Sequence, residues 1–339
     1  MTNEVPMKRQ LRRAAALLAF GLGALGAVPA TAGYTSLTVF GDSLSDTGNL
    51  LLSTGGAIAG APYFAGRFSD GPIWIDVLAA GLGLPSGAVP ALAGGNNFAF
   101  GGARTGTAAS PPGLLAQYGG LWQPRPGAAD PTGLYVVVGG GNDMRDARSA
   151  FTGNSAADQA GRQAAAAAAA NNILTLVGAL AAEGARRVLI STLPDLGATP
   201  EALALGLGAA SSDATARYND LVKGIEATAE ALFSGLDVIT FDMAAVAAAV
   251  RNDALTNGGA VFGITNVSLP CGAFPGSTGI ACAVSAFSDA LHPSAVAHAI
   301  LGAAALHAVP VPGTLVLAAL ALLLVGAAVR RQRLPMARG

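Results

Sequence analysis

Short apolar runs alternate with longer helical stretches through the middle of the chain. Four runs rich in β-branched and aromatic residues have the length of buried strands: 37–40, 134–138, 188–190 and 238–241. Helical sequence lies between or after them, including the alanine-rich stretch 157–185, the periodic stretch 213–233 and the segment 294–306. This alternation predicts a parallel sheet covered on both faces. Ligands of such sheets bind beyond the carboxyl ends of the strands, so the residues after each strand are the candidates for chemistry.

The amino-terminal end has the pattern of an export signal. Residues 8–13 are mostly basic, residues 14–28 are apolar, and Ala30 and Ala32 form the small-x-small pattern that signal peptidase accepts. The sequence therefore predicts a signal peptide over 1–32, cut after Ala32, and an exported protein. An uncleaved membrane anchor is the alternative, but the apolar run is short, contains glycines and has no basic residues after it.

The carboxyl-terminal end has a similar pattern in the opposite order. Val309-Pro310-Val311-Pro312 precedes an apolar run at 315–329 and a basic cluster at 330–333. As a helix this run spans only about 22 Å, against roughly 30 Å of bilayer hydrocarbon. The order resembles the PEP-CTERM sorting signal of Gram-negative secreted proteins, although Val311 stands where that signal has Glu. The resemblance implies a membrane-directed tail over 309–339 and a sorting protease as partner; a buried core helix is the alternative.

Composition supports one acidic domain over 33–308, because no linker or repeat interrupts it. The whole chain has a net charge of −1, but the two ends hold eight of its 19 basic residues and one of its 20 acidic residues. The domain between them therefore has a net charge of −8, which excludes a strongly basic nucleic-acid binder. With three histidines and two cysteines in the chain, we expect neither a metal site nor a cofactor.

A candidate nucleophile follows the first predicted strand. Gly41-Asp42-Ser43 forms a glycine-containing strand-to-helix turn, and such a turn can hold the hydroxyl of Ser43 in the crevice. Taken alone, the same three residues are also typical of an ordinary turn that caps a helix.

Two further glycine-rich turns are candidates for an oxyanion hole. Residues 139–141 follow the second strand, but no Lys-Ser or Lys-Thr comes after them and Met144 replaces the third glycine of a dinucleotide fingerprint. Nucleotide binding is therefore disfavoured, and the amide of Asn142 is the candidate donor. In the turn 97–103, the candidate donor is a backbone N–H directed at the same point as the Asn142 amide. The alternative is that this turn is a plain loop.

A candidate acid–base pair lies near the end of the domain. Asp289 precedes His292 by three residues, a spacing at which the carboxylate can accept a hydrogen bond from the imidazole and fix its tautomer. A histidine before a helix is also typical of a surface or cap position, and we interpret His298 and His307 as structural.

Together, and in this order, the four segments resemble the SGNH or GDSL-type hydrolase family, in particular its secreted lipase and esterase branch. The resemblance covers 34–308 and includes the segments 66–72 and 193–197. It implies a three-layer α/β/α sandwich of the flavodoxin type, with about five parallel strands. Carried over residue by residue, it assigns Ser43 as nucleophile, His292 as general base and acid, and Asp289 as the residue that orients His292. It assigns the oxyanion hole to the Ser43 N–H, the Gly101 N–H and the Asn142 amide, with Gly102 as the alternative to Gly101.

These observations predict a secreted or surface-held serine esterase or lipase that acts on acyl esters of lipids or glycans. A polysaccharide acetyl esterase is the alternative within this class, and a surface protein that binds polysaccharide without turnover is the alternative outside it. In an exported protein we expect a disulfide between Cys271 and Cys282, with two free buried thiols as the alternative.

Overall fold

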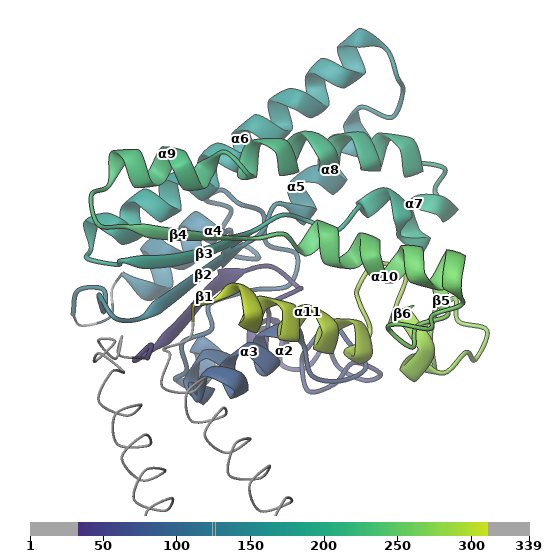
Figure 1. Ribbon diagram of the computed structural model, residues 1–339, viewed down its shortest axis with the longest axis horizontal. Helices are drawn as coiled ribbons and strands as arrows, with labels where there is room; N and C mark the ends of the chain where they lie inside the picture. The colour runs from purple at the N-terminus through teal and green to yellow at the C-terminus, as the bar shows by residue number, and fades with distance from the viewer. Residues whose placement is uncertain (1–32, 124, 126, 311–339) are drawn as a thin grey trace, which may run out of the picture. The chain divides into compact units, whose positions relative to one another are not determined.

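Four parallel strands form the centre of the protein (Figure 1). The computed structural model describes residues 33–123, 125 and 127–310. The strands β1 (Leu37–Gly41), β2 (Leu134–Val138), β3 (Arg187–Ser191) and β4 (Asp237–Phe241) lie in the order β1-β2-β3-β4. All four predicted strands are confirmed, with each bound within one residue. Because the strands are parallel, their carboxyl ends meet at one edge of the sheet.

The segment 96–100 takes the place of a fifth strand along the free side of β1. The Val39 N–H donates to the Asn96 carbonyl at 3.0 Å, and the N–H groups of Phe98 and Phe100 donate to the carbonyls of Val39 and Gly41 at 2.7 and 3.1 Å. Only Asn97 meets the geometry of a parallel bridge with Val39. The segment therefore occupies the position of the expected fifth strand and makes backbone hydrogen bonds to β1, but it does not form a strand as long as the other four.

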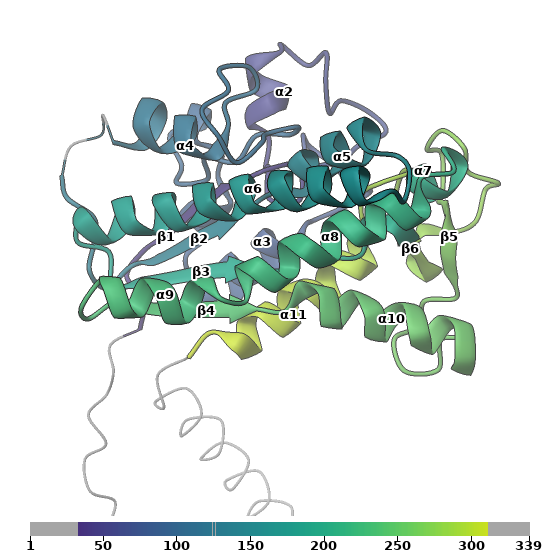
Figure 2. The ribbon, with the colours of Figure 1, turned by 90° about the horizontal axis from the view of Figure 1, so that it is seen from above.

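Helices cover both faces of the sheet, and the fold is an α/β fold of three layers (Figures 1 and 2). On one face lie α4 (Leu114–Ala116), α5 (Gly141–Ala150), α6 (Ala156–Ala182), α8 (Gly208–Val222) and α9 (Ile225–Leu232). On the other lie α3 (Trp74–Leu82) and α11 (Ala295–Ala308). The helices α2 (Asn49–Ser53), α7 (Pro200–Ala204) and α10 (Met243–Asn257) and the two-stranded sheet of β5 (Asn266–Pro270) and β6 (Ser285–Phe287) complete the domain.

The two faces of the sheet have separate cores. Successive strand side chains point to opposite faces, so Phe40, Val137 and Ile190 pack beneath α6 and α8, while Val39 and Leu189 pack against α3 and α11. The helix α6 is also the one described helix that is long and apolar enough to cross a membrane. Its buried side chains belong to the first core, and we assign it to the domain.

The predicted helices are confirmed with one difference. The stretch 157–185 is helical over Ala156–Ala182, and 294–306 is helical over Ala295–Ala308. The stretch 213–233 forms two helices, α8 and α9, with Gly224 at the break, where a glycine disfavours continued helix. The predicted signal peptide, and the predicted tail beyond Pro310, lie outside the described residues.

Both described ends of the domain lie at the edge of the sheet where the strands begin (Figures 1 and 2). Just after the first described residue, the Thr35 N–H donates to the carbonyl of Thr132, two residues before β2 begins. At the other end, Val309 packs in the core beneath α3 and α11. The edge with the carboxyl ends of the strands, where β1 leads into Ser43, lies opposite.

Candidate active site

Ser43 lies in a tight turn directly after β1. The Asp42 carbonyl accepts the N–H groups of Ser45 and Asp46, each at 3.0 Å, and the Asp42 carboxylate accepts the Leu44 N–H at 3.0 Å. Gly41 is required here because a Cβ atom would lie 2.7 Å from the Val138 carbonyl at the end of β2. Burial raises the pKa of Asp42 to about 6.

The structure brings Ser43, His292 and Asp289 together. The Oγ of Ser43 lies 2.8 Å from Nε2 of His292, and Nδ1 of His292 lies 2.7 Å from Oδ2 of Asp289. Ser43 and His292 are 249 residues apart in the sequence. The ring of Phe68 packs on the imidazole, with 4.9 Å between the ring centroids.

The carboxylate of Asp289 accepts four hydrogen bonds. Its Oδ1 accepts the backbone N–H groups of Leu291 and His292 at 2.7 and 2.6 Å, while its Oδ2 accepts Nδ1–H of His292 and, at 2.5 Å, the hydroxyl of Tyr63. Burial alone would raise the pKa of Asp289, but His292 and these hydrogen bonds hold it well below its ordinary value. Asp289 is therefore an ionised acceptor for the imidazole at neutral pH.

Asn142 lies in the first turn of α5, after the left-handed Gly140 at φ 102°. A Cβ atom on Gly140 would lie 2.5 Å from the ring of Tyr218, so this position too requires glycine. The Nδ2 of Asn142 donates to the Ala103 carbonyl at 2.9 Å, and its Oδ1 accepts from Arg145 at 3.2 Å. The amide orientation is fixed by these two contacts, and its second N–H remains available.

The structure corrects the expectation for Gly101. The Gly101 N–H donates to Oδ2 of Asp46 at 2.8 Å, so this donor is already used within the turn. Gly102 follows in the left-handed region at φ 78°, and its N–H has no hydrogen-bond partner within the described part of the chain. The same holds for the N–H of Ser43. Of the two adjoining glycines, Gly102 is therefore the one with a free donor.

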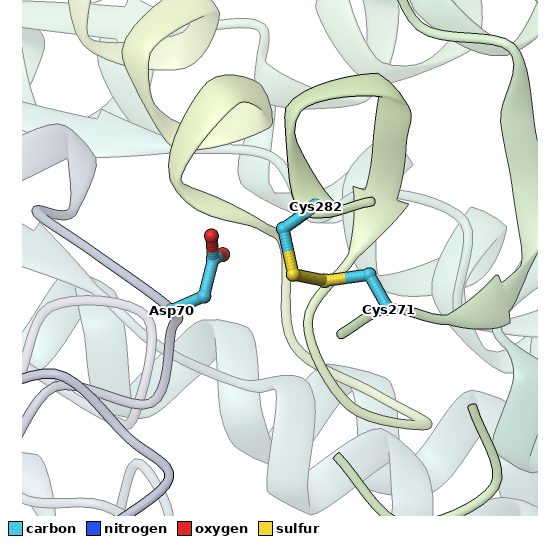
Figure 3. A group of neighbouring side chains, drawn as sticks. All are labelled: Asp70, Cys271 and Cys282. Carbon is cyan, nitrogen blue, oxygen red and sulfur yellow. A yellow bond between two sulfur atoms is a disulfide. The ribbon is translucent and has the colours of Figure 1, made fainter. Parts of the chain in front are cut away.

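The structure contains the predicted disulfide between Cys271 and Cys282 (Figure 3). These two residues and Asp70 form the one close group of potential metal ligands found within the described ranges, but both sulfur atoms are used in the disulfide. Asp70 instead accepts the hydroxyl of Ser288 and the N–H of Ala295, at 2.7 and 2.8 Å. The Asp70 carboxylate thereby holds the segment that carries His292 from both sides.

The sequence of the domain matches a known family. The model of the GDSL-like lipase/acylhydrolase family matches residues 37–305. The chain belongs to this family. Among curated proteins, Lipase 1 of Photorhabdus luminescens is 32% identical over 228 residues, which cover 64% of this chain and 31% of the relative. A phosphatidylcholine-sterol acyltransferase of Aeromonas hydrophila is 28% identical over 206 residues, which cover 56% of this chain and 53% of the relative. The chain thus spans about a third to a half of these relatives.

Two solved structures are also similar to this GDSL-type chain. An acetylxylan esterase from Geobacillus stearothermophilus matches with a TM-score of 0.44 at 14% identity, over 81% of this chain and 94% of the esterase. An extracellular lipase from Streptomyces rimosus matches with a TM-score of 0.42 at 17% identity, over 81% of this chain and 97% of the lipase. Likenesses of this strength do not bear on the substrate.

Three side chains that the sequence did not single out support the GDSL-type site. Tyr63 contacts Asp289, as described above. Asp46 accepts the N–H groups of Gly101 and of residues 48–50 at 2.7 to 3.1 Å, and so joins two turns of the site. Gln117 pairs with both backbone groups of Gly41, at 3.0 and 2.8 Å. The one available signal was the Asp46 side chain itself, an acidic residue in the same turn as Ser43.

A cavity of about 540 Å³ opens beside the site. Ser43, Asn142 and His292 line one part of it, and it continues past the carboxyl ends of β3 and β4 between α8, α10 and α11. Its size is typical of sites that bind small molecules. A substrate in this cavity therefore lies against Oγ of Ser43.

Proposed function

We propose that this protein is an exported serine esterase or lipase that hydrolyses carboxylic acyl esters through an acyl-enzyme on Ser43. The observation that carries the proposal is the pair of contacts from Ser43 Oγ to His292 Nε2, at 2.8 Å, and from His292 Nδ1 to Asp289, at 2.7 Å. A serine hydroxyl becomes a strong nucleophile when an adjacent base, itself oriented by a third group, takes its proton.

In the first half of the reaction, Oγ of Ser43 attacks the ester carbonyl carbon and Nε2 of His292 takes the hydroxyl proton. The negative oxygen of the tetrahedral intermediate accepts hydrogen bonds from the N–H groups of Ser43 and Gly102 and from the free N–H of Asn142. Asp289 stabilises the imidazolium that forms. His292 then donates its proton to the leaving alcohol, and the acyl group remains on Ser43.

In the second half, a water molecule takes the place of the departed alcohol. His292 removes a proton from the water as its oxygen attacks the acyl carbon, and the same three donors stabilise the second tetrahedral intermediate. The bond to Oγ of Ser43 then breaks, Ser43 regains its proton from His292, and the carboxylic acid leaves.

The predicted signal peptide and the Cys271–Cys282 disulfide support export, since disulfides persist in oxidising compartments. We propose that the signal peptide is cut after Ala32 and that the tail over 309–339 directs the protein to a membrane or a sorting protease. N-terminal sequencing of protein from the culture medium or cell surface should begin at Gly33. A mature protein that begins at Met1 would contradict cleavage.

The catalytic proposal is tested by labelling the full chain with a fluorophosphonate probe and assaying short-chain nitrophenyl esters. Ser43→Ala should remove the label and lower kcat by a factor on the order of 10⁶. Ser45→Ala is the matched control, because Ser45 lies in the same turn but its buried hydroxyl has no hydrogen-bond partner within the described residues; it should retain labelling and turnover. Unchanged hydrolysis by a folded Ser43→Ala variant would refute the proposal.

A further inference from the structure

The cavity beside Ser43 has an apolar wall that extends well beyond the reacting groups. Its far part is lined by Leu193 after β3, by Ala247 and Val250 on α10, by Val267 on β5 and by Ile300 and Leu301 on α11. Leu193, Val250 and Leu301 are nearly fully buried. An aliphatic chain that enters this part of the cavity removes apolar surface from water on both sides.

Three polar side chains along the wall are already paired within the protein. The Oδ1 of Asn219 accepts the Leu193 N–H at 2.8 Å, and its Nδ2 donates to the Leu193 carbonyl at 2.9 Å. Asp195 accepts from Gly197 N–H and Ser212 Oγ, each at 2.8 Å, and the Thr215 hydroxyl donates to a backbone carbonyl at 2.7 Å. At these positions a sugar hydroxyl would lose its hydrogen bonds to water with little replacement. The other polar side chains that α10 adds to the lining, Arg251 and Asn252, are exposed to solvent.

We infer that this cavity binds a medium- or long-chain fatty acyl group, and that the preferred substrates of the protein are lipid esters. This inference rests on the proposed function. The assignment to the acyl part follows from the order of the reaction, because the acyl group stays bound to Ser43 after the alcohol has left. The apolar space continuous with Ser43 suits the part that stays, whereas the alcohol must leave to admit water.

The inference is tested by kcat/KM of the full chain on nitrophenyl acetate, butyrate, octanoate and laurate, each below its micelle concentration. Burial of each methylene should raise kcat/KM roughly three- to fourfold until the cavity is filled. A parallel series of alkyl acetates, in which only the alcohol lengthens, should show a much smaller increase.

Ala247→Trp narrows the cavity from the wall of α10. It should lower kcat/KM for octanoate and laurate at least tenfold more than it lowers kcat/KM for acetate. Ala249→Trp is the matched control: Ala249 lies on the same helix, is exposed and does not line the cavity. The measurements on the wild type with esters of increasing acyl length test the inference even if the Ala247→Trp variant does not fold.

Each outcome has a distinct meaning. A wild-type preference for acetate, or no dependence on acyl length, overturns the acyl-chain inference but leaves the proposed esterase function intact. A length dependence that appears only in the alkyl acetates overturns the assignment to the acyl part. Failure to hydrolyse any ester, acetate included, overturns the proposed function itself.

A second inference rests on the contact of Tyr63. We infer that Tyr63 is a positioning residue that acts through Asp289. Its hydroxyl donates to the same oxygen of Asp289 that faces His292, so it withdraws part of the negative charge that would stabilise the imidazolium. The ring is held by Phe68 and Phe274, at centroid distances of 5.3 and 5.1 Å.

The test is the pH profile of kcat/KM for Tyr63→Phe, which keeps the ring and removes the hydroxyl. Without this donor Asp289 stabilises the imidazolium more strongly, so the midpoint of the acid limb should move up by roughly half to one pH unit. Asp42 and His298, the other titratable groups whose charge is coupled to that of His292, are unchanged in this variant.

Tyr118→Phe is the matched control, because its hydroxyl lies 3.4 Å from Glu183 and outside the cavity; its midpoint should stay in place. A fall in kcat for Tyr63→Phe with an unmoved midpoint would show that Tyr63 only supports the local structure. An unchanged rate and midpoint would equally overturn the inference.

Discussion

The two halves of the catalytic site are held in place by different kinds of contact. The nucleophile half, which comprises residues 41–50 and 97–103, is fixed by backbone groups that converge on buried side chains, above all Asp46 and Gln117. The acid–base half, residues 288–293, is fixed by side chains of the distant loop 54–73, with Tyr63 on Asp289 and Asp70 on Ser288, and the disulfide lies nearby.

This difference shows how one site can combine a part fixed by the sheet with a part whose support depends on the solution conditions. The first half is built onto the edge of the sheet and depends only on the fold. The second half has a covalent bond beside it that can be reduced, so we expect reduction to disturb this half first. Four predictions test this contrast.

The largest expected effect is on the nucleophile half. Asp46→Ala leaves four N–H groups, three of them buried, without their acceptor, and the free energy of unfolding should fall by roughly 3–5 kcal/mol. Urea unfolding followed by circular dichroism measures it. The control Asp220→Ala, at an exposed position of α8, should change stability by less than about 0.5 kcal/mol. A loss below 1 kcal/mol for Asp46→Ala would mean that Asp46 does not hold this half.

A substitution of Asn142 tests whether the nucleophile half also stabilises the oxyanion. Removing its amide with Asn142→Ala should lower kcat by about 10²- to 10³-fold, because one donor to the developing oxyanion is lost. Steady-state kinetics on a short-chain ester measure this, with Asn171→Ala on the exposed side of α6 as the control. If kcat falls less than threefold, Asn142 is not an oxyanion donor.

The disulfide tests the acid–base half. Replacing both Cys271 and Cys282 by Ser should lower the free energy of unfolding by up to roughly 3 kcal/mol, because closure of the loop between them restricts the unfolded chain. A reducing agent should destabilise the wild type by a similar amount and leave the double variant unchanged. Equal stability of the oxidised and reduced wild type would contradict the prediction.

The smallest expected effect concerns pH. Burial of His298 on α11, together with the nearby His292, lowers its pKa to about 3, and its Nδ1 accepts the Trp74 N–H at 3.3 Å. Because the unfolded state binds the proton more readily, His298 lowers stability as pH falls from about 6.5 towards 3. Between pH 7 and 5 the loss should be about 2 kcal/mol greater in the wild type than in His298→Gln. Parallel pH dependences of the two proteins would contradict this.

Much of the fold could be predicted because it is encoded locally. The strands are short, continuous apolar runs, and their bounds matched within one residue. Ser43, Asn142 and His292 could be found because each follows a strand or precedes a helix in a short motif. The helix α10 was missed because its alanine-rich sequence has no clear apolar stripe, and β5 and β6 are short strands that include a proline or only three residues.

The supporting contacts could not be predicted because they join distant positions. Tyr63 and Asp289 are 226 residues apart, Gln117 and Gly41 are 76 apart, and Asp46 and Gly101 are 55 apart. No local pattern indicates that the two residues of each pair meet. The choice between Gly101 and Gly102 likewise depends on where each N–H points, which the backbone conformation determines and two adjoining glycines do not reveal.

The position of the two described ends has a practical consequence. Both lie at the edge of the sheet where the strands begin (Figure 1), whereas Ser43 follows the opposite end of β1. An attachment made through either end therefore leaves the mouth of the cavity unobstructed. Residues 34 and 309 are accordingly suitable points for a fusion partner or an immobilisation support, and a protein displayed on a solid surface in this way would present its catalytic edge to substrates in solution.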